Sequence, residues 1–288
     1  MASPGSAWGF FKTIQTISPK EIEDEASIAF KLAIIGTDEN RAWLKESLLT
    51  PAANVLERDE AENHLRDFET GPDADTTKAF AFSLYAGPQG EAIGVRGYNS
   101  VPFSGGVDEI VNGILARRPD LAVALSRRLP VFRIPGCNML IRGTSRVNGG
   151  IALLSALPGI LPIINPIFPA AAVGDVILLT KNQIVLIMRL AAAHGRKPAY
   201  SKQVKEMLAT VGTALGWRMV ARELVGLVPA GIGAGMKAMI AYSGTAAVGK
   251  AALFYYQTGR KATPEQIREA FNESTEEAKS EIENMRPK

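Results

Sequence analysis

The chain has 288 residues with 47% hydrophobic and 21% charged side chains, and its 32 basic and 29 acidic residues leave a net charge of +3. This length and composition exclude a wholly disordered protein, because they supply enough apolar surface for a sizeable core. The small net charge argues against a dedicated nucleic-acid-binding protein. The single cysteine, Cys137, excludes an intrachain disulfide and a multi-thiolate metal site. We expect no bound cofactor or metal ion.

The N-terminal residues 1–29 are expected to form a helical segment. They lack the charged start, continuous apolar stretch and cleavage site of a secretory signal peptide. The sequence Ser18-Pro19-Lys20-Glu21 is typical of a helix start, with an N-cap, a proline at the first position and a glutamate at the third. Without a signal and with one thiol, the parts of the chain outside a membrane are expected in the reducing cytoplasm.

Residues 30–118 contain the patterns of a small α/β lobe. Residues 30–36, FKLAIIG, form a short apolar run that ends in glycine and predicts a buried parallel strand. Residues 37–49 predict a helix whose apolar face would carry Trp43, Leu44, Leu48 and Leu49.

Further strands of this lobe are expected at residues 78–85 and 92–96, and the glycine-rich residues 87–106 predict surface loops between and after them. Residues 60–67 form a polar stretch that we interpret as helical. His64 lies in it and is expected to be a surface histidine rather than a general base.

The turn after the first strand stands where nucleotide-binding folds place their phosphate loop. Such a loop needs glycines, a lysine and a Ser or Thr, but the corresponding positions hold Arg41, Ala42 and Trp43. Asp38 and Glu39 also bring negative charge to the place of the phosphates. We therefore expect that this loop does not bind a nucleotide phosphate.

A group of arginines precedes a long uncharged stretch. Between Arg117 and Arg146 the chain has seven arginines and a single acid, Asp120. Basic residues near a membrane surface attract anionic lipid headgroups. We call five of these arginines the basic collar and expect them to face lipid: Arg127, Arg128, Arg133, Arg142 and Arg146.

Residues 147–174 carry no charge over 28 positions, a length typical of a membrane span. Their four prolines break a straight helix, and both flanks are basic, which favours the same side of a membrane for both ends. These facts fit a helical hairpin with arms at residues 150–163 and 170–193. A shallow re-entrant hairpin in the membrane and a buried hairpin in a soluble bundle remain equal alternatives.

The second arm of this hairpin carries a polar stripe. Asp175, Asn182 and Arg189 recur every seven residues and share one helical face, with Gln183 beside them. Since buried charge requires partners, another helix should supply them. The candidate partners are Arg218, Arg222 and Glu223. We expect a structural polar network, in preference to a transport or catalytic site.

The C-terminal part is rich in small residues. Residues 244–250, GTAAVGK, match the start of a phosphate-loop pattern, but Ala251 replaces the Ser or Thr and the segment before it is helical, so we reject the match. Gly212 with Gly216, and Gly231 with Gly235, have the spacing of closely packed helices. Thr263-Pro264-Glu265-Gln266 predicts the start of a last, charged helix.

Four segments together resemble an uncharacterised bacterial family: AVALSRRLPVFR, IRGTSRVNGGIALLSALPGILPIINPIF, GDVILLTKNQIVLIMRLAAAHG and GTAAVGKAALFYYQTG. The family is found in YcjF-like inner-membrane proteins and at the C-terminus of some Era-like GTPases, and the resemblance covers about residues 120–260. It implies a membrane-associated helical module next to a GTPase or a relic of one. No catalytic residues follow from it.

We therefore expect an α/β plus α fold, in which a small degenerate GTPase-like lobe precedes a mostly α-helical bundle with apolar hairpins. The expected divisions are an N-terminal helical segment, the lobe, a YcjF-like membrane-associated domain and a charged C-terminal helix or tail, at residues 1–29, 30–118, 119–260 and 261–288.

The expected function is that of a non-enzymatic scaffold or tether on the cytoplasmic side of the inner membrane, which acts through self-assembly or partner binding. Its expected partners are anionic lipid, a second copy of the chain or a GTPase, and not nucleic acid. Two alternatives stay open. One is a nucleotide hydrolase with a remodelled loop, and the other is a soluble helical adaptor in which the apolar stretch is core.

Overall fold

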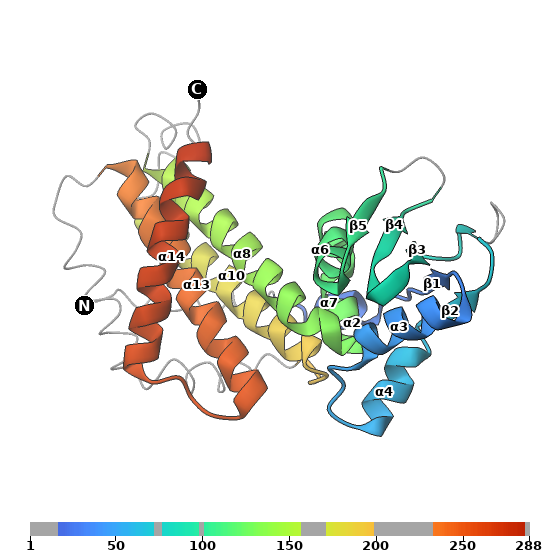
Figure 1. The fold of residues 1–288 in the computed structure, drawn as a ribbon. Helices are drawn as coiled ribbons and strands as arrows, with labels where there is room; N and C mark the ends of the chain where they lie inside the picture. Colours follow the sequence, from blue (N-terminus) through green and yellow to red (C-terminus); the bar gives the residue numbers. More distant parts are fainter. Residues whose placement is uncertain (1–16, 72–76, 98–100, 157–170, 199–232, 286–288) are drawn as a thin grey trace. The chain divides into compact units, whose positions relative to one another are not determined.

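The computed structural model of the chain describes residues 17–71, 77–97, 101–156, 171–198 and 233–285 (Figure 1). The chain divides into two compact units. The first, which we call the α/β unit, comprises Glu23–Met139 and Ala192–Gly195. The second, which we call the helical unit, comprises Met1–Ile22, Leu140–Ala191 and Arg196–Lys288. The expected combination of an α/β part with a helical part is confirmed at this level.

The α/β unit is built on a mixed five-stranded sheet with the order β2-β1-β3-β4-β5. β1 is parallel to β2 and β3, whereas β4 is antiparallel to both of its neighbours. All four residues of β1 are buried, as expected for a central strand. The strands span Leu32–Ile35 (β1), Leu65–Phe68 (β2), Phe82–Ala86 (β3), Ala92–Val95 (β4) and Phe103–Gly105 (β5).

Two helices form a layer on this sheet. α3 (Asp38–Leu49) packs on β1 and β3, α6 (Val107–Arg117) packs on β4 and β5, and the two helices contact each other. Their buried leucines and isoleucines supply much of the core. The described residues also form α2 (Pro19–Ser27), which belongs to this unit from Glu23 on, α4 (Val55–Glu62) and α7 (Ala122–Arg128). Short 3-10 turns lie at Pro88–Gly90, Pro119–Leu121 and Pro130–Phe132.

The predicted strand at residues 30–36, the helix after it and the strand at residues 92–96 are confirmed. The interpretation of residues 60–67 as one helical stretch was wrong, because α4 ends at Glu62 and β2 begins at Leu65. The loop expected at residues 87–106 contains β4, which was predicted, and also β5. Trp43 does not belong to the apolar face of α3, since its side chain is 54% exposed.

In the helical part of the chain, the structure describes four long helices: α8 (Arg133–Ser155), α10 (Ala171–Ala193), α13 (Ala234–Thr258) and α14 (Pro264–Met285). α13 and α14 pack along each other (Figure 1). α8, α10 and α13 approach closely at Gly249, where a Cβ would lie 2.7 Å from Ile141 and 3.1 Å from Leu186. The start of α14 is confirmed as a capping box, with reciprocal bonds between Thr263 and Gln266 of 2.9 and 3.3 Å.

The hairpin expected near residues 150–193 is described only in its arms. α8 begins at Arg133, well before the expected first arm, and continues to Ser155, whereas α10 coincides with the second arm. The proline-containing turn at residues 157–170 lies outside the described residues. Among the helices that the structure describes, none combines the length and the apolar character needed to cross a bilayer.

The contact of α6 with the sheet generates a prediction on stability. The Phe103 ring lies against Gly94 and Gly113, where an added Cβ would come within 2.3 and 2.2 Å of it, and the Arg117 guanidinium lies 4.0 Å above its centroid. Gly113→Ala should therefore destabilise the chain by about 1–3 kcal/mol, because Phe103 must leave its place.

The matched control is Gly143→Ala in α8, where a Cβ would meet no atom of another described element within 4 Å. It should leave the stability unchanged or raise it by up to about 1 kcal/mol, since alanine favours the helix. Thermal and urea unfolding of both variants measure the difference. Equal effects of the two substitutions would contradict the packing described for Phe103.

Candidate functional site

The ends of the three parallel strands lie side by side at one edge of the sheet, which we call the carboxyl edge. Ile35 pairs in register with Phe68 of β2 and with Tyr85 of β3. Gly36 follows with φ of +146°, a conformation that favours glycine, and a Cβ there would lie 3.0 Å from the Ala86 carbonyl oxygen. The chain therefore turns tightly against β3 into α3. Open α/β sheets bind ligands at this edge.

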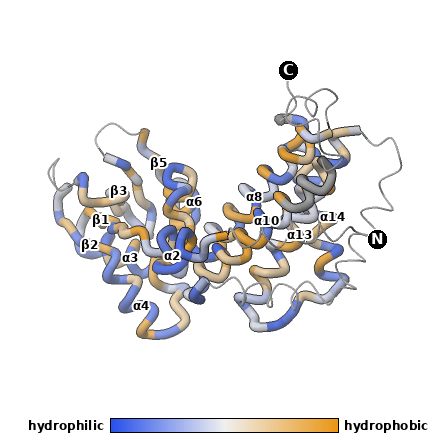
Figure 2. Tube along the Cα trace, turned by 180° about the vertical axis from the view of Figure 1, so that it is seen from behind, coloured by the Kyte–Doolittle hydropathy of each residue, from blue (hydrophilic) through white to orange (hydrophobic). Residues whose placement is uncertain are grey.

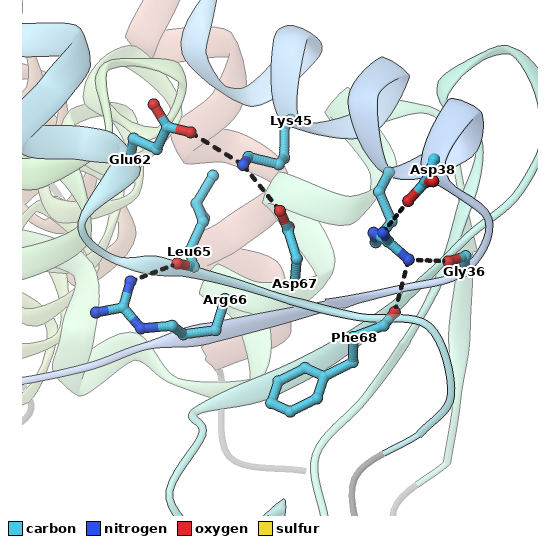
Figure 3. Close-up of polar contacts among 9 residues, drawn as sticks. Gly36, Asp38, Lys45, Glu62, Leu65, Arg66, Asp67 and Phe68 are labelled. Carbon is cyan, nitrogen blue, oxygen red and sulfur yellow. Dashed lines mark hydrogen bonds and ion pairs between the residues drawn. The ribbon is translucent and has the colours of Figure 1, made fainter.

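Arg41 occupies the carboxyl edge with its own side chain. Its Nη1 donates to the carbonyl oxygen of Gly36 and, over 3.3 Å, to that of Phe68, and its Nη2 contacts the carboxylate of Asp38 (Figure 3). The side chain is only 12% exposed. A guanidinium thus lies between the ends of β1 and β2, where the phosphate loop of a nucleotide-binding fold would begin.

The N-terminus of α3 is also occupied by groups of the chain. The Thr37 hydroxyl accepts from the Asn40 backbone N–H over 3.4 Å, and the Asn40 side-chain amide donates to the Ala86 carbonyl over 3.3 Å. Asp38 and Glu39 lie in the first turn. These carboxylates stabilise the positive end of the helix dipole. Negative charge at this position opposes the binding of a phosphate.

Lys45 lies one turn further along α3 and contacts two carboxylates. Its Nζ is 3.0 Å from Glu62 and 3.1 Å from Asp67 (Figure 3). Burial works to lower the pKa of Lys45, but the hydrogen bonds and negative charges of the two carboxylates outweigh burial, so the pKa is raised. The ammonium group stays charged and is held in ion pairs with Glu62 and Asp67.

A polar hollow of about 300 Å³ lies beside α3. It is lined by Asp38, Arg41, Ala42, Lys45, Glu46, Leu49, Arg58, Glu62 and Asp67. Every charged residue in this lining takes part in an ion pair with another, including Arg58 and Glu46 at 2.6 Å. The hollow therefore lacks uncompensated positive charge for a nucleotide.

His64 is half-buried rather than fully at the surface. Its ring stacks on Phe30 with centroids 4.7 Å apart, and its Nδ1 lies 3.2 Å from the Phe30 carbonyl oxygen. Burial lowers the pKa of His64, and Nδ1 is the donor in this contact because a carbonyl oxygen only accepts. This arrangement is that of a packing residue at the starts of β1 and β2.

Three arginines of the basic collar form ion pairs with glutamates of the same chain. Arg128 pairs with Glu60 at 3.1 Å and Arg133 with Glu57 at 2.6 Å. Arg146 of α8 forms a two-point pair with Glu281 of α14, with an Nε–Oε2 distance of 2.8 Å.

The other two arginines of the collar have no such partner within the described residues. Arg142 is exposed and Arg127 is half-buried, and the part of the chain that the structure describes gives neither of them an ion pair. As far as the described residues extend, these two collar arginines are the ones whose positive charge an external anion could bind without displacing an internal carboxylate.

The polar stripe of α10 takes part in a buried hydrogen-bond network. The Asn182 amide donates to Asn148 of α8 over 2.7 Å, and Asn148 donates over 2.8 Å to the hydroxyl of Thr245 in α13. Gln183 donates to the same hydroxyl over 3.2 Å, and Thr245 itself donates to the Ala241 carbonyl. The network thus joins three helices.

The predicted partners of this stripe, Arg218, Arg222 and Glu223, lie outside the described residues, as does the side chain of Asp175. Arg189 lies further along α10 and is half-buried. Sequence reasoning missed Asn148 and Thr245. The sequence did contain one indication of this network, because Thr245 is a polar residue within the small-residue segment 244–250.

That segment lies inside α13, as expected when its phosphate-loop match was rejected. Gly244–Gly249 are buried in the helix, and the Lys250 Nζ pairs with Glu273 of α14 at 3.1 Å. The lysine of the apparent motif is therefore engaged between two helices.

Comparisons of the chain with protein-family models, with curated proteins and with solved structures find no match.

The buried network generates a second prediction. Thr245→Val removes the hydroxyl while keeping the shape, so it leaves one donor of Asn148 and one of Gln183 without an acceptor. Each unpaired buried donor costs about 1–3 kcal/mol. We expect a clear loss of stability in chemical unfolding.

Thr144→Val in α8 is the control, because within the described residues the Thr144 hydroxyl bonds only to the carbonyl four residues earlier, a bond that Thr245 also makes. Thr144→Val should lower the free energy of unfolding only slightly. If both variants unfold at the same urea concentration as the unaltered chain, the network does not stabilise the bundle.

Proposed function

We propose that the chain is a non-enzymatic scaffold or tether at the cytoplasmic face of the bacterial inner membrane. In this proposal its α/β unit is a degenerate GTPase-like lobe that no longer binds nucleotide. The helical unit is a membrane-associated module of the YcjF-like kind, which acts through self-assembly or through a partner such as a GTPase.

The observation that carries the non-enzymatic part is the side chain of Arg41. It donates to the carbonyls that end β1 and β2 and thereby occupies the place of a phosphate loop. The acids at the start of α3 and the paired charges of the adjacent hollow support the same conclusion. Nucleotide hydrolysis would require both this contact and these charges to rearrange.

Membrane association is supported by the charge pattern of the chain. The uncharged residues 147–174 follow the basic collar directly. In the collar, Arg127 and Arg142 have no ion pair within the described residues. Such arginines attract anionic headgroups, each contributing on the order of 1 kcal/mol near the surface.

The nucleotide part is tested by titration with fluorescent GTP and ATP analogues in the presence of Mg²⁺. We expect no saturable binding by the unaltered chain. Arg41→Met should lower the stability by about 1–3 kcal/mol, since two carbonyls lose their donor, and should still not bind nucleotide because Asp38 and Glu39 remain.

Arg58→Met serves as the control, because Arg58 forms an exposed ion pair on the same hollow and its loss should lower the stability less than Arg41→Met does. Saturable binding of GTP or ATP that disappears in Gly36→Ala or Lys250→Ala would contradict the proposal and favour the hydrolase.

The membrane part is tested by fractionation of cells that express the untagged chain, with high-salt and alkaline washes of the membrane pellet. We expect the unaltered chain in the pellet. The double variant Arg127→Glu with Arg142→Glu should be released at lower salt, since each reversal removes an attraction on the order of 1 kcal/mol and adds a repulsion.

Lys31→Glu with Lys261→Glu is the control, because it changes the net charge equally at two exposed lysines outside the collar. It should behave like the unaltered chain. Recovery of the unaltered chain only in the supernatant would overturn membrane association.

A further inference from the structure

α4 is a short helix with very little apolar contact. It spans eight residues, and Ala61 is its only buried residue. Val55 and Leu56 at its start are 71% and 81% exposed, and the rest of the helix is largely hydrophilic (Figure 2). Helices of this length are not stable in water by themselves. Other forces must therefore hold α4 on the α/β unit.

Ion pairs supply these forces on both sides of the helix. On one side Glu57 contacts Arg133 at 2.6 Å and Glu60 contacts Arg128 at 3.1 Å. On the opposite side Arg58 pairs with Glu46 of α3 and Glu62 with Lys45 of α3. Attachment through ion pairs is weakened by salt and by any competing charge.

Arg133 is the most enclosed of the arginines that hold α4, and its hydrogen-bonding capacity is not used up. Its side chain is 21% exposed, its Nη2 donates to Glu57, and its Nε is buried without a hydrogen-bond partner within the described residues. Glu57 contacts Arg133 through Oε1 alone, while its Oε2 accepts the backbone N–H of Ala53 over 2.6 Å. The two-point contact that a guanidinium forms with a phosphate is therefore absent.

We infer that α4 is an autoinhibitory element, in which Glu57 and Glu60 cover two arginines that an anionic lipid surface would otherwise bind. This inference rests on the proposed membrane function and adds a regulation to it. A phosphate headgroup offers Arg133 the second acceptor that Glu57 withholds. When lipid displaces the two carboxylates, α4 loses its attachment on this side and is left with the contacts to α3.

The decisive variant is Glu57→Gln with Glu60→Gln. Glutamine at position 57 keeps an acceptor for the Ala53 N–H, so the capping box at the start of α4 is preserved while the charge is removed. The matched control is Glu39→Gln with Glu69→Gln, which changes the net charge equally at two exposed glutamates that contact no collar arginine.

Binding is measured by co-sedimentation of the full chain with vesicles of phosphatidylcholine, with and without phosphatidylglycerol. Each arginine released should tighten binding about fivefold, so the Glu57/Glu60 variant should bind the anionic vesicles about fivefold to thirtyfold more tightly than the unaltered chain. The control should bind like the unaltered chain. Adding Arg128→Gln and Arg133→Gln should abolish the gain.

Hydrogen exchange gives a second, independent measurement. On addition of anionic vesicles to the unaltered chain, the backbone amides of α4 should lose protection while those of β1 keep it. The same loss with inorganic phosphate alone would mean that a free anion, and not a lipid surface, is the ligand, and would overturn the inference as stated.

The outcomes separate the two proposals. If the unaltered chain binds anionic vesicles and the Glu57/Glu60 variant binds no more tightly than the control, autoinhibition by α4 is overturned and the membrane function stands. If neither the unaltered chain nor any variant binds, the membrane function is overturned and the inference with it.

Discussion

The α/β unit depends on the contact between the Arg41 guanidinium and the backbone carbonyls at the ends of β1 and β2. Carbonyls at the ends of parallel strands need donors, and in ligand-binding sheets the loops at this edge are shaped around a ligand. Here a side chain from the first turns of α3 supplies the donors, so the sheet ends and the helix start are joined without a ligand. The acids around Arg41 then follow, because a buried guanidinium requires a carboxylate nearby.

The two units solve the problem of buried polar groups in different ways. The α/β unit pairs charges, with Lys45 between two carboxylates and α4 attached by glutamates. The helical unit uses uncharged groups: the hydroxyl of Thr245 accepts hydrogen bonds from the side-chain amides of Asn148 in α8 and Gln183 in α10. Charged pairs at a partly exposed surface are sensitive to salt and to competing ions. A buried network of amides and hydroxyls instead fixes the register of the helices that it joins. Regulation is therefore expected in the former unit and rigidity in the latter.

The sequence predicted those elements whose signal is local. β1 is a continuous apolar run, and the start of α14 has its capping residues in adjacent positions. β2 and β5 were missed because only Leu65 is buried in β2, and because β5 is positioned by the contact of Phe103 with Gly94 of β4 and Gly113 of α6. In the same way, the acids that oppose a phosphate could be identified from their position after β1. The contacts of Arg41 with β2, and of Asn148 with α13, join residues far apart in the chain, and no local pattern encodes them.

A charged residue that is conspicuous in a sequence is thus not by itself a binding residue. Of the five collar arginines, three form ion pairs with glutamates of the chain, and Arg127 and Arg142 lack such a partner within the described residues. The collar therefore combines arginines that are available at once with arginines that become available only when an internal carboxylate is displaced. In the autoinhibition that we infer, an anionic lipid surface must compete with Glu57 and Glu60 for Arg133 and Arg128, and all four residues belong to the α/β unit. Such competition distinguishes a regulated electrostatic contact from a permanently exposed basic patch.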